Sequence, residues 1–365
     1  MVIATLGGDS LLVGGCVRNA VIEREATDVD IATKHRPEFV IQKLEASGIK
    51  AIPTGIDHGT VTAVINKKPF EITTLRKDVE TDGRRAVVEF SVDWLEDAKR
   101  RDFTMNTLLM DLNGNVFDPT RKGFEDLEAN HVVFVGDAEQ RIREDYLRIL
   151  RFFRFHAWFG QGEMDQEALS ACGKLANKIG ELSKERITQE VLKLLSASQP
   201  ILVLKTLFEN NILPELFHVK HDLKILGRYY DFAHVDPMSS LVILSAFDVK
   251  HLSVLETRMT FSNAQKKQFE SLCASLDGFD LSHKSIKRMI YKTDNDFTAQ
   301  LAYLFAAKDW QELTAETCDI LENWEAPKFP MTGEDLIKQG HKPGPELGKK
   351  LKQLEREWLE QELSR

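Results

Sequence analysis

Leu12-Val13-Gly14-Gly15-Cys16-Val17-Arg18-Asn19 is the stretch that decides how the first part of the chain folds. The apolar residues before the two glycines predict a strand, and the residues after them predict the start of a helix. Glycines let a backbone approach a phosphate closely, a helix N-terminus adds N–H donors, and Arg18 adds a charge suited to phosphate oxygens. Two glycines alone more often mark an ordinary strand-to-helix turn, so the neighbouring motifs decide the interpretation. The stretch is not a GxGxxG motif and does not indicate a dinucleotide-binding fold.

A pair of acidic residues, Asp28-Val29-Asp30, follows this turn. Alternate side chains of a strand point to the same face, so Asp28 and Asp30 are predicted to project together while Val29 faces the core. Carboxylates that close repel one another unless a cation lies between them. Mg²⁺ prefers hard oxygen ligands and takes one or two carboxylates together with substrate phosphates. Glu71, flanked by apolar residues of another predicted strand, is a candidate third carboxylate because an acid there needs a partner.

Five arginines fall between residues 141 and 154, against two acidic residues. Asp145 and Arg148 are three residues apart, so on a helix they share nearly one face and can hydrogen-bond a nucleobase edge as acceptor and donor. Each further step of three residues, to Arg151 and then Arg154, turns the row by about 60°. One ligand is therefore not expected to touch all four groups equally. Apolar residues separate these arginines, so we expect the arginines to need buried partners.

Three further polar stretches are less specific. Arg100-Arg101-Asp102-Phe103-Thr104-Met105-Asn106, taken alone, is also typical of a charged helix cap. Residues 76–85 are polar and predict a mobile surface loop. His221-Asp222 is one piece of a metal phosphohydrolase pattern whose other pieces are missing, so we interpret it as two polar residues on the surface.

Composition limits the class of protein. The chain has 365 residues with a formal net charge of −9, and 42% of its residues are hydrophobic, which suggests two or three folded units rather than disorder. The overall acidity disfavours non-specific nucleic-acid binding but allows a local basic site. No apolar stretch of membrane-spanning length and no signal peptide is evident. Four separated cysteines without a CxxC pair favour a reducing, cytoplasmic location.

The pattern of apolar and polar residues changes near residue 138. Before it, β-branched runs alternate with turns, and the runs 59–65 and 70–75 predict a hairpin. After it, helical periodicity dominates, and Ser183 is a candidate N-cap. Breaks between helices are expected near residues 160–162, 196–200, 214, 237 and 327–330. The predicted fold class is α+β, with an N-terminal head built on a small mixed β-sheet and an all-α remainder.

In this order, the motifs GGxVR, DxD, RRDFTxN and EDxLRxLRxxRF resemble the class II tRNA nucleotidyltransferases, or CCA-adding enzymes, which share a superfamily with bacterial poly(A) polymerases. The resemblance covers about residues 11–160, continues through 182–187 and is weaker over 333–348. It implies a nucleotidyltransferase head (1–137), a neck with a nucleotide-selecting helix (138–200), a helical body (201–325) and a helical tail (326–365).

The resemblance also implies a site. Asp28 and Asp30 would hold Mg²⁺, with Glu71 at the acidic strand position. The residues implied to contact the nucleotide are Gly15, Arg18, Arg101, Asp145, Arg148, Arg151 and Arg154. Asp145 and Arg148 are implied to select the base. Asn19 stands where the family commonly has Asp, and Ile22-Glu23 replaces the usual Leu-Gly; neither change is expected to affect the metal site.

The implied reaction is template-independent addition of CMP and AMP to the 3′ end of tRNA, from CTP and ATP, with two-metal catalysis. Alternatives are a CC-adding or A-adding enzyme, a poly(A) polymerase, and a non-enzymatic RNA-binding helical scaffold. Asp82-Gly83-Arg84-Arg85 matches a flexible element of full CCA enzymes and favours complete CCA addition. The intact acidic pair argues against the scaffold. The sequence gives no signal for oligomeric state. Lys349, Lys350 and Lys352 are candidate contacts to the RNA backbone or a solvated face.

Overall fold

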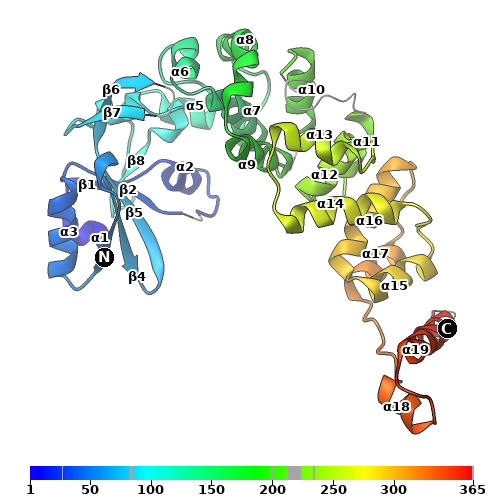
Figure 1. Ribbon diagram of the computed structural model, residues 1–365. Helices are drawn as coiled ribbons and strands as arrows, with labels where there is room; N and C mark the ends of the chain where they lie inside the picture. Colours follow the sequence, from blue (N-terminus) through cyan, green and yellow to red (C-terminus); the bar gives the residue numbers. More distant parts are fainter. Residues whose placement is uncertain (27, 83–84, 199, 213–222, 233–234, 364–365) are drawn as a thin grey trace. The chain divides into compact units, whose positions relative to one another are not determined.

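A mixed β-sheet of seven strands forms the start of the chain (Figure 1). The structure is a computed structural model that describes residues 1–26, 28–82, 85–198, 200–212, 223–232 and 235–363. The strands are β1 (Ser10–Val13), β2 (Asp30–Thr33), β3 (Lys50–Gly55), β4 (Thr60–Ile65), β5 (Lys68–Thr74), β8 (Leu109–Met110) and β9 (Val116–Phe117), in the order β3-β4-β5-β2-β1-β8-β9. Neighbours pair antiparallel except β2 and β5, which are parallel.

The register of three neighbouring strands positions the acidic residues. Val13, the last residue of β1, lies opposite Asp30, the first residue of β2. On the other side of β2, Asp30 lies opposite Glu71 of β5. The glycine turn that follows Val13 and the two carboxylates therefore meet at one end of the sheet.

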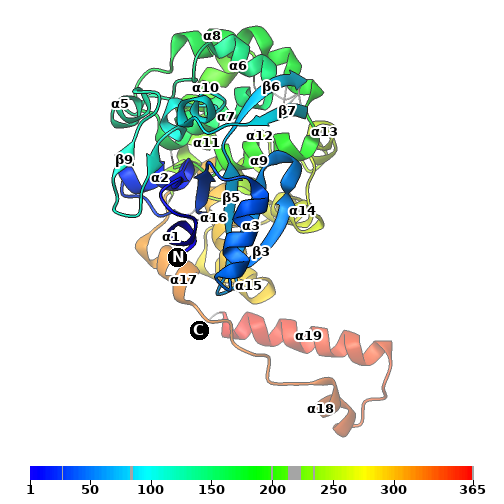
Figure 2. The same cartoon turned by 90° about the vertical axis from the view of Figure 1, so that its left-hand side faces the viewer.

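Buried apolar residues pack against both faces of the sheet. Helices α1 (Val2–Leu6) and α3 (Pro37–Ala46) cover one face (Figures 1 and 2). Pro37 starts α3 at its first position, and Val40 and Leu44 lie one turn apart on its buried side. They pack with strand residues that include Ile31, Val61 and Ile72. On the other face, Val13, Ala32, Leu75 and Leu109 form a second cluster, against which Trp94 of α4 (Trp94–Lys99) packs.

The predicted hairpin over 59–65 and 70–75 is confirmed as β4 and β5. Its connection is the two-residue turn Asn66-Lys67, where both residues have positive φ (50° and 65°), as a type I′ turn requires.

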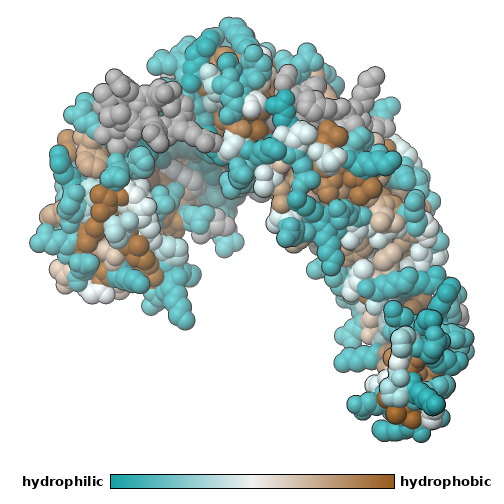
Figure 3. Space-filling view, viewed as in Figure 1, coloured by the Kyte–Doolittle hydropathy of each residue, from teal (hydrophilic) through white to brown (hydrophobic). Residues whose placement is uncertain are grey.

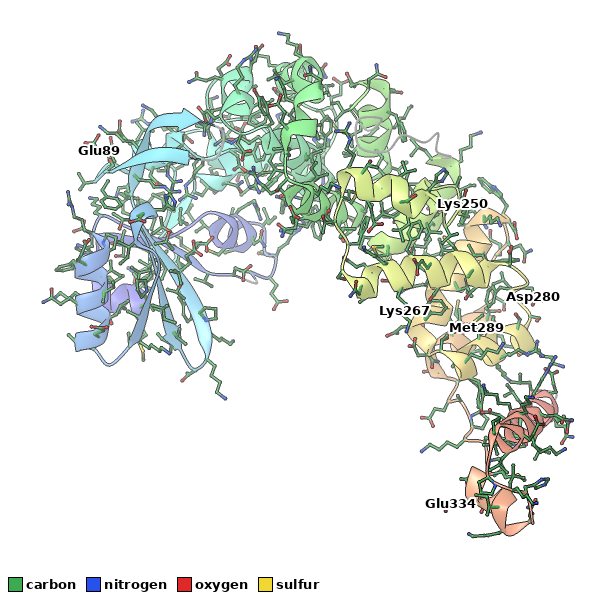
Figure 4. All side chains as sticks on the ribbon, viewed as in Figure 1. Glu89, Lys250, Lys267, Asp280, Met289 and Glu334 are labelled. Carbon is green, nitrogen blue, oxygen red and sulfur yellow. The ribbon has the colours of Figure 1, made fainter. Side chains whose placement is uncertain are left out.

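The prediction of a loop over 76–85 is wrong. β6 (Arg76–Asp82) and β7 (Arg85–Phe90) form an antiparallel hairpin. Lys77 lies opposite Glu89, which is labelled in Figure 4, and their charged groups are 3.0 Å apart. Opposite charges across two strands stabilise pairing without the alternating apolar pattern that sequence analysis relies on.

Every described element of secondary structure from Ala138 onward is a helix, as predicted. With the sheet, this confirms the α+β fold class. The remaining helices of the first part are α2 (Gly15–Val21), α5 (Gly123–Glu128), α6 (Ala138–Glu144), α7 (Leu147–Phe159), α8 (Gln166–Leu175), α9 (Lys184–Leu195) and α10 (Ile201–Glu209), with 3-10 turns at Ile56–His58, Thr104–Asn106 and Ala176–Glu181. Ser183 is the N-cap residue of α9, although its side chain makes no capping hydrogen bond.

The chain falls into two units, Met1–Phe217 and His218–Arg365. The division into head, neck, body and tail at 137, 200 and 325 stays a prediction. The second unit contains α11 (Leu223–Tyr230), α12 (Pro237–Leu244), α13 (His251–Arg258), α14 (Asn263–Leu276), α15 (His283–Lys292), α16 (Asn295–Lys308), α17 (Ala315–Asn323), α18 (Gly333–Lys338) and α19 (Pro345–Glu362). The predicted breaks at 160–162, 196–200 and 327–330 fall between helices, and Pro237 starts one. Pro214 and His221-Asp222 lie outside the described residues.

Polar contacts attach α19 to α15 within the second unit. Tyr291 donates a hydrogen bond to Glu355 at 2.6 Å, and Lys284 lies 2.8 Å from Glu360. Hydrophilic residues dominate the surface of α18 and α19 in the view of Figure 3. No helix in the described part of the chain combines the length and the apolar character that a membrane span requires.

The arginines of α7 have the buried partners that sequence analysis expected. The ion pairs are Arg148–Glu144 at 2.6 Å, Arg151–Asp102 at 2.5 Å and Arg154–Glu190 at 2.5 Å. Asp102 precedes the 3-10 turn of the head, and Glu190 lies on α9. These carboxylates therefore attach α7 to the head on one side and to α9 on the other.

Removing the Asp102 carboxylate should destabilise the protein. Burial alone would raise the pKa of Asp102, but Arg151, Asn106 and the Phe103 N–H outweigh it and lower the pKa from 3.8 to about 2. Asp102→Asn leaves Arg151 without this partner, so we expect a loss of about 3 kcal/mol at pH 7 in urea unfolding. A depressed folded-state pKa stabilises above the unfolded value, so the difference should shrink as pH falls from about 4 toward 2.

Glu181→Gln is the matched control, because the Lys178–Glu181 pair is exposed. We expect it to change the stability by less than about 1 kcal/mol. Equal effects of the two substitutions would contradict the structural role of Asp102.

Candidate active site

The glycine turn has the conformation that the sequence predicted. Gly14 precedes α2 with φ 74° and ψ −133°, a region that strains any residue with a side chain. A Cβ on Gly14 would lie 3.3 Å from Nη1 of Arg101. The glycine therefore serves both the turn and the close approach of this arginine.

Arg101 connects the end of α4 to the turn. Its Nη2 and Nε donate to Oδ2 of Asp97, a buried residue of α4, at 2.9 and 3.2 Å. Its positive charge also acts on Asp30, where it opposes the rise in carboxyl pKa that burial causes. Arg101 is thus held between Asp97, the glycine turn and the acidic end of the sheet.

The carboxyl groups of Asp28 and Glu71 each act on that of Asp30 at this end of the sheet. Partial burial raises the pKa of Asp30, Arg101 opposes this, and Asp28 raises the pKa further. Partial burial also raises the pKa of Glu71, and the charge of Asp30 adds to the shift. Asp28 lies just before β2 rather than on it, so the alternation of a strand does not by itself align the pair. The charge of Asp28 nonetheless acts on Asp30, so the two carboxyl groups lie near one another.

The donor set fits a hard divalent cation. Carboxylate oxygens with raised pKa values gain from a positive charge between them. Within the described residues, no group of three or more His, Cys, Asp or Glu side chains is placed to hold a metal ion by itself. Two carboxylates that leave positions for phosphate oxygens are what Mg²⁺ commonly uses.

Arg18 is buried beside the turn, with 8% of its surface exposed. Nη1 donates to the Asn106 amide oxygen at 2.7 Å, and Nη2 and Nε donate to that of Asn19 at 2.8 and 3.1 Å. Its guanidinium lies 3.9 Å from the centre of the Phe159 ring. Burial, with Arg154 as the next cause, lowers the pKa of Arg18 to about 10.

Arg18 donates its side-chain hydrogen bonds to neutral groups. Within the described residues, no carboxylate is recorded in contact with its guanidinium, and both side-chain acceptors are amides. Asn19, the departure from the family pattern, is one of them. Buried charges are normally paired, so Arg18 has capacity for an anion.

The predicted base-selecting pair is arranged differently from the expectation. Asp145 does not lie on a helix beside Arg148; it follows α6 with extended backbone (φ −158°, ψ 105°), and α7 starts at Leu147. Its Oδ1 accepts from the Leu147 N–H at 3.1 Å, and its Oδ2 accepts from Arg186 at 2.6 Å. A carboxylate that caps the following turn in this way ends the helix that periodicity predicted.

Arg148 is held by three acceptors, two from α6 and one from the residue that follows α4. Its Nη1 donates to Glu144 at 2.6 Å and to the Arg141 carbonyl at 2.7 Å, and its Nη2 lies 3.3 Å from the Arg100 carbonyl. Arg100 adjoins Arg101, so Arg148 lies near the glycine turn. Asp145 follows Glu144 directly, which keeps both members of the pair in this region.

Arg151 and Arg154 form ion pairs with Asp102 and Glu190, and their contact with a nucleotide stays a prediction. Their charges and that of Arg18 lie near one another, since both lower the pKa of Arg18. Sequence analysis assigned no role to Asp97, Asp102, Asn106, Glu144, Arg186 or Glu190. The need of each arginine for a buried acceptor was the available signal, but it does not say which acid provides it.

Three sequence families match successive parts of the chain. They are the "Poly A polymerase head domain" over residues 10–133, the "Probable RNA and SrmB- binding site of polymerase A" over residues 163–222, and the tRNA nucleotidyltransferase domain 2 over residues 241–365. The first match contains the glycine turn, the acidic residues and Arg101.

Individual relatives match nearly the whole chain. The mitochondrial CCA tRNA nucleotidyltransferase 1 of Danio rerio is 33% identical over 95% of this chain and 82% of its own length. The CCA-adding enzyme of Streptococcus sanguinis is 33% identical over 97% of this chain and 90% of its own. The crystal structure of the Bacillus stearothermophilus CCA-adding enzyme in complex with CTP superimposes with a TM-score of 0.78 at 26% identity, covering 99% of this chain and 92% of that one. Together with the motifs, these matches show that the chain belongs to the family of CCA-adding tRNA nucleotidyltransferases.

Proposed function

We propose that this nucleotidyltransferase adds CMP and AMP, from CTP and ATP and without a nucleic-acid template, to complete the CCA end of tRNA. The observation that carries the proposal is the meeting of Asp30 and Glu71 beside the glycine turn and Arg101, in the unit that also contains Asp145 and Arg148. The match to a relative crystallised with CTP supports the nucleotide class.

Asp28 and Asp30 would hold Mg²⁺, with Glu71 beside them. When bound, the metal lowers the pKa of the attacking 3′-hydroxyl and neutralises charge on the departing pyrophosphate. The raised pKa values of Asp30 and Glu71 support this role, because a cation stabilises the ionised forms that their surroundings disfavour.

The glycine turn, Arg18 and Arg101 would bind the triphosphate. Gly14 and Gly15 leave room for phosphate oxygens near the backbone. Arg18 lacks a carboxylate partner among the described residues, and an incoming phosphate would supply the missing negative charge. Arg101 is already oriented by Asp97, so its binding would require little reordering.

The reaction is attack of the tRNA 3′-oxygen on the α-phosphorus, with cleavage of the bond to the β-phosphate oxygen. It depends on positioning and electrostatics and needs no covalent enzyme intermediate. Asp145 would accept a hydrogen bond from the amino group of cytosine or adenine, and Arg148 would donate to the adjacent ring nitrogen.

We propose tRNA as the acceptor and the cytoplasm as the compartment. All four cysteines are unpaired, which supports a reducing environment, while the name of the Danio rerio relative places that protein in mitochondria. Lys350 and Lys352 of α19 are candidate contacts to the RNA backbone. Lys349 pairs with Glu346 at 2.8 Å, an exposed contact that RNA could replace.

Labelled CTP and ATP, given separately and together with tRNA that lacks its 3′ end, test the proposal on one gel. We expect two added nucleotides with CTP, none with ATP alone, and three with both. A product that stops after two nucleotides with both substrates would indicate a CC-adding enzyme. Long products with ATP would indicate a poly(A) polymerase, and no addition would favour the RNA-binding scaffold.

Asp30→Asn should remove the response to Mg²⁺. The raised pKa of Asp30 means that its ionised form is disfavoured in the folded state, so its stability contribution falls as pH rises through that pKa. In EDTA at pH 7.5 the variant should therefore melt no lower than wild type. Mg²⁺ should raise the melting temperature of wild type by a few degrees and that of the variant by less, and transfer should be lost.

Glu45→Gln, an exposed residue of α3 on the opposite face of the sheet, is the control and should respond to Mg²⁺ like wild type. Equal Mg²⁺ responses of Asp30→Asn and wild type would refute the assignment of Asp30 as a ligand.

Asp145→Ala should keep transfer but lose base selection. Without the carboxylate acceptor, the preference for CTP and ATP over UTP and GTP should fall by about tenfold or more in kcat/KM. Glu163→Gln, an exposed residue before α8, should keep the wild-type preference. Full selectivity in Asp145→Ala would show that another group reads the base.

A further inference from the structure

Two hydrogen bonds fix the carboxylate of Asp145. The N–H of Leu147 binds Oδ1, a contact between residues two apart in the chain. Nη2 of Arg186 binds Oδ2 at 2.6 Å, from a residue 41 positions later. The local contact fixes one oxygen near the start of α7, but only the distant arginine fixes the direction of the other.

Arg186 occupies a position that its own helix does not favour. It lies in the first turn of α9, at the positive end of the helix dipole, where a cation is disfavoured. Its side chain is 31% exposed and that of Asp145 is 26% exposed, so water screens the pair only in part. The pairing with Asp145 offsets a placement that the stability of α9 alone would oppose.

The same face of α9 also holds α7. Glu190 is one helical turn after Arg186, so both side chains project on one side. Glu190 binds Arg154 at 2.5 Å and lies 3.6 Å from Arg151. α9 thus presents the cation of Arg186 to Asp145 and the anion of Glu190 to the arginines of α7. These complementary charges fix the carboxylate of Asp145 relative to α7.

The chemistry of the bases makes the direction of this carboxylate important. Cytosine and adenine carry an amino donor at the position where uracil and guanine carry a carbonyl acceptor. An ionised carboxylate only accepts hydrogen bonds, so it attracts the first two bases and repels the others. This discrimination requires the oxygen to stay where the amino group arrives, because a carboxylate that rotates away neither attracts nor repels.

We propose that Arg186 is a positioning residue for base selection. It orients the carboxylate of Asp145 toward the incoming base and so sets the preference for amino-bearing over carbonyl-bearing nucleobases. The inference rests on the proposed function, in which Asp145 reads the base. It assigns Arg186 no contact with the metal site or with the transferred phosphate.

Selectivity separates this role from a merely structural one. Loss of an α7–α9 contact that only supports the fold would lower the addition of all four nucleotides by the same factor. Loss of a positioning contact changes the ratio between them. It should also raise the KM for CTP more than it lowers kcat, because the groups that perform transfer remain in place.

The test compares Arg186→Ala, Arg186→Lys and the control Arg143→Ala in single additions of CTP, ATP, UTP and GTP to tRNA. Arg143 is an exposed arginine of α6 that pairs with Glu139 at 2.5 Å. We expect the CTP-to-UTP ratio of kcat/KM to fall about tenfold in Arg186→Ala, less in Arg186→Lys, and less than twofold in Arg143→Ala. Arg186→Lys keeps the charge, so it provides a folded variant if Arg186→Ala unfolds.

A second comparison uses Asp145→Ala as the background. If Arg186 acts through Asp145, adding Arg186→Ala to Asp145→Ala should leave the selectivity unchanged. A further loss in that background, or ratios in folded Arg186→Ala and Arg186→Lys within twofold of wild type, would overturn the inference alone. A wild-type chain that adds neither C nor A to tRNA would overturn the proposed function and the inference together.

Discussion

The arginines of α7 enter the interior of the first unit, where a buried charge requires a partner. Glu144, Asp102 and Glu190 provide it from three separate segments, and this requirement fixes how α7 lies against the head and against α9. Removing one of these carboxylates would leave a guanidinium desolvated without its counter-charge. Arg18 differs, because its recorded side-chain acceptors are the neutral amides of Asn19 and Asn106. The contrast separates arginines that hold the fold from one with capacity for a ligand.

Local pattern was sufficient where a short segment determines its own structure. The apolar run before Gly14 gave a strand, the two glycines gave a turn, and periodicity after residue 138 gave helices. It failed where a distant residue decides. Residues 76–85 lack apolar alternation and yet pair as strands, with Lys77 opposite Glu89. Asp145 fits a helical row in sequence, but its carboxylate binds Arg186 and the start of α7, so the backbone leaves the helix there.

In the candidate site, too, local sequence pattern predicted some residues, and contacts with distant segments decided others. Sequence analysis found the acidic residues and the arginines, because carboxylates in apolar strands and arginines in apolar helices are unusual enough to require explanation. It could not find Asp97 or Glu190, because their neighbours in the sequence are typical of acidic residues on an exposed helix face. Only the packing of α4 near the glycine turn and of α9 against α7 gives these two residues their buried partners.

Arg100, Arg101 and Asp102 connect the acidic end of the sheet to the arginines of α7. Arg101 faces Gly14, Asp97 and the acidic end of the sheet, whereas Asp102 faces Arg151 of α7. The carbonyls of Arg100 and Arg101 accept further hydrogen bonds from Arg141, and that of Arg100 also accepts from Arg148. A displacement of this segment would therefore move both Arg101, beside the acidic end of the sheet, and Asp102, the partner of Arg151. Transfer and base selection would then be coupled through Arg100, Arg101 and Asp102. Substitutions at Asp102 should therefore disturb both, although its carboxylate contacts Arg151, Asn106 and the Phe103 N–H and not the acidic end of the sheet.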